Sequence, residues 1–168
     1  MLHAVEHIPE DEVTETFDPK LFHVAEPRSF SELRAGETFR SPSRTVTEAH
    51  FAAFQALSGD NHPIHYDIEY CRARGHRGLL AHGLQVLAFT APGAGSFPHV
   101  IGDSLIAFIE QSSTFSKPVY VGDTLYPTLT ITALIPQRTT GIVVMAATIH
   151  NQNAELVLSG EQKFLLRK

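Results

Sequence analysis

The sequence predicts an α+β fold in which one buried helix is wrapped by an antiparallel β-sheet. Residues 124–135 alternate apolar and polar side chains, which is the period of a half-buried strand. Residues 84–91 carry apolar side chains at the spacing of one helical stripe and include very few polar ones, which is typical of a buried helix. A chain of 168 residues is long enough for one domain with a substantial core and short for two.

The elements before this helix follow from capping residues and breakers. Residues 1–35 are polar and interrupted by prolines, so we expect an N-terminal extension, with the domain itself over residues 36–168. Residues 37–47 suit a first strand. Thr47 can then cap a helix that ends at Gly59.

Apolar side chains of that first helix recur at helical spacing, at Phe51, Phe54 and Leu57. A short helical turn over residues 67–74 is closed by a glycine. The buried helix then opens near His82 and stops at Pro92, and its stripe consists of Leu84, Leu87, Ala88 and Ala91.

Strands fill the rest of the chain. We expect them at residues 105–115, 124–135, 142–150 and 156–166, which with the first strand make a sheet of about five or six. Pro127 lies inside the second of these runs and indicates an edge or a bulge, because proline cannot donate to a sheet ladder. The polar cluster at residues 151–153 suits a turn.

Composition excludes several classes of protein. A hydrophobic fraction of 43% and a charged fraction of 18% suit a globular chain. The formal charge of −5, with no basic run, argues against nucleic acid as a partner. No apolar run approaches the ~20 residues that span a bilayer, no signal peptide is evident, and Cys71 has no partner for an internal disulfide. We therefore expect a cytoplasmic enzyme or binding protein, with no membrane partner.

The most informative motif is Ser58-Gly-Asp-Asn-His-Pro-Ile-His65. It places an acid, Asp60, and a base, His65, on either side of a proline that prevents a continuous helix. A carboxylate and an imidazole are groups that can hold and activate water. A second motif, Leu-Leu-Ala-His-Gly-Leu at residues 79–84, opens the buried helix, and we expect both motifs to belong to one site.

Together with Phe-Ser-Lys-Pro-Val-Tyr-Val-Gly-Asp-Thr-Leu at residues 115–125, these motifs resemble the MaoC-like acyl dehydratases, which include the (R)-specific enoyl-CoA hydratases. The resemblance covers roughly residues 36–167 and implies a hot-dog fold. It also implies that Asp60 and His65 grip the water that adds to an α,β-unsaturated thioester, and that the Gly83 N–H polarises the thioester carbonyl. The sequence itself supports this role for the Gly83 N–H, since N–H groups in the first turn of a helix have no intrahelical partner and glycine permits close approach of a substrate.

The resemblance further implies an acyl-CoA substrate, an (R)-3-hydroxyacyl product, no cofactor, and a homodimer or a dimer of dimers. Around the catalytic residues we expect substrate contacts from His62, Ser58, His82 and Leu84. His62 departs from the family, in which asparagine is common at this position. An imidazole there can hold the loop or alter substrate choice, and we favour the structural role.

Taken singly, each of these residues also has a purely structural interpretation. Asp60 alone suits a turn, His65 alone a partly buried histidine, and Gly83 tight helix packing. Asp123 suits a turn before a strand. Four cations, Arg72, Arg74, Arg77 and Lys117, can meet CoA phosphates, although solvated surface charge is the commoner role of such residues.

Metal binding is not expected, because the spacing of His62, His65, His76 and His82 matches no standard zinc pattern. Ser58 lacks the surroundings of a hydrolase nucleophile. Two rivals remain open: a hot-dog thioesterase, and a non-catalytic subunit that binds acyl-CoA. The acyl group is also open between straight, branched and dicarboxylic chains, with Phe51, Phe54, Leu87 and Phe89 as possible walls of its tunnel.

Overall fold

The computed structural model describes residues 18–168, and within them the predicted antiparallel sheet is confirmed. Its six strands are β1 (Thr38–Arg40), β2 (Arg44–Thr45), β3 (Leu105–Phe115), β4 (Thr124–Pro136), β5 (Thr140–Asn151) and β6 (Leu156–Arg167). They run in the order β1-β4-β5-β6-β3, with β2 beside β1 on the same flank of β4. Strand β3 therefore has a strand on one side only.

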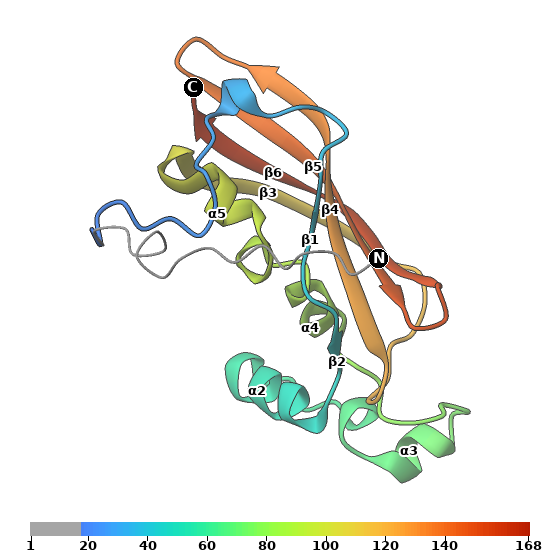
Figure 1. Cartoon of the computed structure of the whole chain (residues 1–168). Coiled ribbons are helices and arrows are strands. Elements are labelled where there is room, and N and C mark those ends of the chain that lie inside the picture. Colours follow the sequence, from blue (N-terminus) through green and yellow to red (C-terminus); the bar gives the residue numbers. More distant parts are fainter. Residues whose placement is uncertain (1–17) are drawn as a thin grey trace, which may run out of the picture.

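The helices lie along one face of the sheet and beyond one of its ends. They are α2 (Glu48–Ser58), α3 (Ile68–Arg72), α4 (Gly83–Ala88) and α5 (Phe97–Ile101), with short 3₁₀ turns η1 (Phe30–Glu32), η2 (Pro63–His65), η3 (Pro92–Ala94) and η4 (Gly102–Ser104). Figure 1 shows α4 and α5 along the sheet, with α2 and α3 grouped below α4. None of the helices in residues 18–168 is long and apolar enough to span a membrane.

The expected first strand is divided in two, and the division accounts for Pro127. Strand β1 pairs Arg40 with Thr128, and β2 resumes where Arg44 pairs with Leu125. Pro42 lies in the interval, where it interrupts a ladder because it has no N–H. Pro127 lies opposite this interruption, so β4 has an unpaired edge there over a short stretch only, as one of the two interpretations of Pro127 predicted. The bulge in β4 lies elsewhere, between Ile131 and Ala133.

Two clusters of buried side chains attach the helices to the sheet. One joins β4, β5 and β6 to α5, and the other joins the same strands to α2 and α4. Phe30 and Leu33, which the sequence places in the extension, are 6% and 1% exposed and belong to the first cluster. The packed part of the domain thus includes residues before 36, and residues 1–17 of the expected extension lie outside the described residues.

The expectation for the buried helix is wrong in two respects. Helix α4 ends at Ala88 instead of running to residue 91, and its expected apolar stripe is exposed at Leu84, Ala88 and Ala91, while Leu87 is partly buried. Leu84 is 65% exposed, whereas Gln85 and Val86 are buried. A helix that is apolar all round has no polar face to show which side packs on the sheet, so the stripe alone did not determine its orientation. Leu57, one of the expected apolar positions of α2, is also exposed, at 84%.

Candidate active site

The loop that carries the acid begins at the end of α2. Gly59 adopts a left-handed conformation (φ 71°), as expected for a residue that ends a helix. Ser58 Oγ donates to the Phe54 carbonyl over 2.7 Å and accepts from the Asp60 N–H over 3.1 Å. The Ser58 hydroxyl therefore shapes the turn before Asp60, and its contact with substrate stays a prediction.

His62 holds the next turn. The His62 ring Nδ1 accepts a hydrogen bond from the Ile64 N–H over 3.3 Å, which makes His62 the N-cap of η2. The backbone N–H of His62 donates to Asp60 Oδ1 over 3.2 Å. An asparagine oxygen fills the same capping role. This contact is in line with the structural role favoured for His62, and contact with substrate stays a prediction.

His65 is oriented by the backbone of a distant segment. The ring is 9% exposed, and its Nδ1 lies 2.6 Å from the Leu80 carbonyl oxygen. Because a carbonyl only accepts, Nδ1 carries the proton and Nε2 keeps its lone pair. Burial lowers the pKa of His65 below its usual value, and nearby His82 lowers it further, against the opposing effects of the Leu80 carbonyl and Asp60. His65 is therefore arranged as a neutral base.

His82 lies against His65 and is buried, at 2% exposure. The two rings stack with centroids 3.7 Å apart and planes inclined by 23°. His82 Nδ1 lies 3.0 Å from Gln85 Oε1, and the Tyr66 hydroxyl lies 2.9 Å from Nε2. Since both ring nitrogens already have protein partners, His82 acts in positioning His65, and a direct contact with substrate stays a prediction.

Asp60, His65 and His82 are close enough to raise the question of a metal ion. Their potential ligand atoms all lie within 4.8 Å of one another. The two imidazole planes are nearly parallel, however, so their in-plane lone pairs do not converge on one point. His82 Nε2 is also engaged by Tyr66. The geometry thus favours our expectation that no metal binds, and that expectation is open to the test described below.

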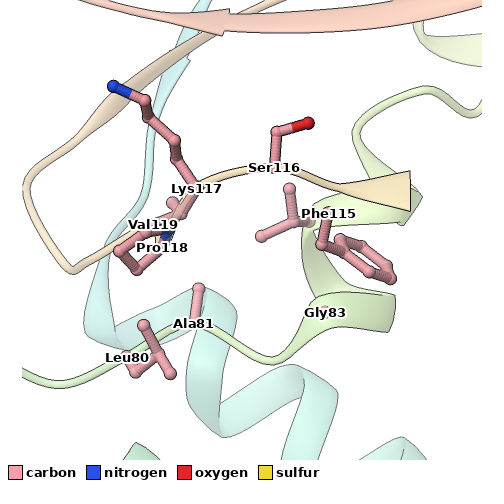
Figure 2. A pocket seen from close by; sticks show the side chains of 9 residues that line it. Leu80, Ala81, Gly83, Phe115, Ser116, Lys117, Pro118 and Val119 are labelled. Carbon is pink, nitrogen blue, oxygen red and sulfur yellow. The ribbon is translucent and has the colours of Figure 1, made fainter. Parts of the chain in front are cut away.

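Gly83 stands at the start of α4 beside a pocket of about 380 Å³. Figure 2 shows this pocket between the start of α4 and the segment 115–119 that follows β3. Within the described chain, the Gly83 N–H makes no hydrogen bond to another backbone group. A Cβ at residue 83 would lie 3.2 Å from Phe115 Cζ, so glycine permits the close approach of these segments. Leu84, the next residue, points away from the protein interior.

The four cations considered for the CoA phosphates all have partners in the protein. Arg77 pairs with Asp123, which is 1% exposed and also accepts from the Tyr120 N–H, so this acid holds several segments together and does more than form a turn. Lys117 pairs with Glu155. Arg72 pairs with Glu69, and Arg74 lies over the Tyr70 ring.

Three groups of the site were not predicted from the sequence: the Leu80 carbonyl, Tyr66 and Gln85. Gln85 had a readable signal, because glutamine at the third helical position can cap its own helix, and here its Oε1 accepts from the His82 N–H over 3.3 Å. Tyr66 and Leu80 had none. Of the predicted catalytic set, Asp60 and His65 come together, and Gly83 follows directly on His82.

Comparisons with known proteins show the family of the chain. Residues 30–154 match the family model described as a MaoC like domain. An (R)-specific enoyl-CoA hydratase of Rhodospirillum rubrum is 29% identical over 109 residues, which are 65% of this chain and 73% of the relative. A mitochondrial 3-hydroxyacyl-[acyl-carrier-protein] dehydratase of Arabidopsis thaliana is 28% identical over 148 residues, 83% of this chain and 84% of the relative.

A solved structure from Mycobacterium tuberculosis, described as a double hot-dog fold, superimposes with a TM-score of 0.70 at 25% identity. The alignment covers 84% of this chain and 44% of that one. The antiparallel sheet with its helix α4 is thus a hot-dog domain. The chain belongs to the MaoC-like dehydratase family.

Proposed function

We propose that this protein catalyses the reversible hydration of a trans-2-enoyl-CoA to a 3-hydroxyacyl-CoA. The observation that carries the proposal is the state of His65. Its Nδ1 proton is committed to the Leu80 carbonyl, its Nε2 has no hydrogen-bond partner among residues 18–168, and the Asp60 carboxylate is close by. A base next to a carboxylate, with a backbone N–H at Gly83 that no described backbone group accepts, provides the groups that water addition to a conjugated thioester needs.

The steps follow from these groups. Asp60 and His65 hold a water molecule, His65 Nε2 takes a proton from it, and its oxygen bonds to the β-carbon. The double-bond electrons move toward the thioester oxygen, where the Gly83 N–H stabilises the negative charge. A proton then returns to the α-carbon from the same face, which by resemblance to the family gives the (R) product. Hydration changes no oxidation state, so the proposed chemistry needs no redox cofactor, and the roles of activating water and polarising the carbonyl are assigned to Asp60, His65 and the Gly83 N–H.

We also propose that the protein forms a homodimer through β3. This edge strand leaves Ile106, Phe108 and Ile109 between 43% and 51% exposed, and Leu84 of α4 is exposed as well. An open edge with apolar side chains is a surface that pairing with a second copy would cover. Size measurement in solution tests this: a monomer at micromolar concentration would contradict it.

The test of activity is incubation with crotonyl-CoA and a panel of branched and dicarboxylic enoyl-CoAs. Loss of the enoyl absorbance without release of thiol supports hydration. Release of thiol without hydration would indicate a thioesterase, and binding without either reaction would indicate a non-catalytic subunit. The same substrates on acyl carrier protein test the choice of carrier, since the Arabidopsis relative is named for that carrier.

Asp60→Asn supplies the matched variant. It keeps the size of the side chain and its acceptor oxygen for the His62 N–H, so the fold should persist. Hydration should fall at least ~100-fold, the usual scale for an acid–base group. A variant with near-native turnover would mean that another carboxylate handles the water.

A further inference from the structure

The groove between α2 and α4 carries an inference about the acyl group. It has a volume of about 240 Å³ and lies beside Phe54, Leu57 and Phe89. Phe54 has its ring centroid 4.8 Å from that of His82, which in turn stacks on His65. The groove therefore lies on the far side of His82 and Phe54 from the proposed base.

Three polar side chains line this groove: Arg44, His50 and Gln85. Gln85 Oε1 is engaged by the His82 N–H and Nδ1, which fixes the direction of the amide. Its Nε2 is buried and has no hydrogen-bond partner among the described residues. A buried donor without a partner is unfavourable, and because this nitrogen is closed to solvent, a ligand acceptor would satisfy it once the Gln85 amide turns toward the groove.

The other two side chains also offer only donors. His50 Nδ1 accepts from the Thr47 N–H over 3.0 Å, so in the neutral ring the proton is on Nε2. The Arg44 guanidinium lies 4.6 Å above the Phe89 ring, and no carboxylate within residues 18–168 pairs with it. None of the aspartates and glutamates in residues 18–168 lines the groove.

A groove that offers hydrogen-bond donors and no free acceptors is complementary to a ligand group that only accepts. A hydroxyl would need an acceptor for its own proton, whereas a carboxylate only accepts and carries the charge that Arg44 lacks a partner for. We propose that the α2–α4 groove holds the distal end of the acyl chain and selects a terminal carboxylate, so that the preferred substrate is a short dicarboxylic enoyl thioester. This inference rests on the proposed hydration.

Two substrates that differ only at the distal end test it: glutaconyl-CoA and 5-methylhex-2-enoyl-CoA, in which two methyl groups replace the carboxylate oxygens. The measured quantity is the ratio of their kcat/KM values, in which any effect on the shared CoA portion cancels. The native protein should favour glutaconyl-CoA at least about tenfold, because a site built for hydrogen bonding rejects the analogue that leaves its donors unpaired.

Arg44→Met keeps the stem over Phe89 and removes the charge, and it should lower the ratio at least about tenfold. Gln85→Glu keeps an oxygen toward His82 and replaces the donor by an anion, and it should lower the ratio as well. Arg138→Met is the control for net charge: this residue is exposed on the turn between β4 and β5, and its substitution should leave the ratio unchanged.

The outcomes separate the two proposals. A native preference for the methyl analogue, or an unchanged ratio in Arg44→Met, overturns the carboxylate assignment while hydration of both substrates upholds the proposed function. Hydration of no acyl-CoA in the panel would remove the proposed function and this inference with it.

Discussion

Replacing His62 by alanine should loosen the turn that carries His65. The substitution removes the Nδ1 acceptor and leaves the Ile64 N–H without its cap. Loss of an N-cap costs about 0.5–2 kcal/mol. The bond is 3.3 Å long and exposed, so we take the lower half of that range, about 0.5–1 kcal/mol. The closed turn would then be disfavoured about two- to fivefold relative to open forms.

This factor sets an upper limit on the loss of activity. If His62 acts through the cap alone, kcat/KM for hydration should fall no more than about fivefold in His62→Ala, well short of the effect of Asp60→Asn. The free energy of unfolding in urea should fall by about 0.5–1 kcal/mol. His62→Asn should restore both quantities, because an asparagine oxygen caps the same N–H.

Two results would refute the reasoning. A loss in His62→Ala as large as that of Asp60→Asn, not restored by asparagine, would mean that the imidazole itself handles water or substrate. Unchanged stability together with unchanged kcat/KM would mean that the cap makes no contribution.

Four further predictions concern titration, metal and packing. Because the pKa of His65 is lowered by burial, the acid limb of kcat/KM should have its midpoint below the ordinary value of about 6.5, and a midpoint above it would contradict the neutral-base assignment. Because the pKa of His65 is lower in the folded protein, protonation of the ring favours the unfolded chain. The stability that the neutral ring contributes is complete above about pH 6.5 and is lost as the pH falls toward the lower folded-state pKa. Denaturant titrations across this pH range, with His65→Gln as control, measure the loss. Dialysis against EDTA should leave hydration unchanged, whereas activity that is lost and then restored by a divalent ion would show that Asp60, His65 and His82 hold a metal. Gly141→Ala should lower the free energy of unfolding by about 1–3 kcal/mol, since its Cβ would lie 2.5 Å from Phe30 Cδ2, while Gly93→Ala, with no atom within 4 Å of the new Cβ, serves as the neutral control.

Local signals predicted the elements well where capping and alternation act within a few residues. Thr47 and Gly59 bound helix α2 as expected, and the alternating run at 124–135 became β4. The orientation of α4 was not available from the sequence, because the two polar residues of the segment 84–91, Gln85 and Thr90, are buried while Leu84 of the apolar stripe is exposed. Such a stripe is consistent with a surface that a second copy covers.

The candidate site was predictable in part for a similar reason. Asp60 and His65 lie five residues apart on one loop, so their proximity follows from the turn that joins them. The stacking of His65 on His82 and its bond to Leu80 depend on how the segment 79–82 docks against the sheet, which no local pattern specifies.

The backbone origin of the Leu80 contact has a consequence for mutagenesis. Alanine scanning changes side chains and leaves carbonyls in place, so a scan of this site would miss the group that fixes the tautomer of His65. That carbonyl is held in position by the bridge between Leu80 and Tyr120 and by the bond from the Ala81 N–H to the Val119 carbonyl. Substitutions near Tyr120 can therefore change which nitrogen of His65 carries the proton, without touching the His65 side chain itself.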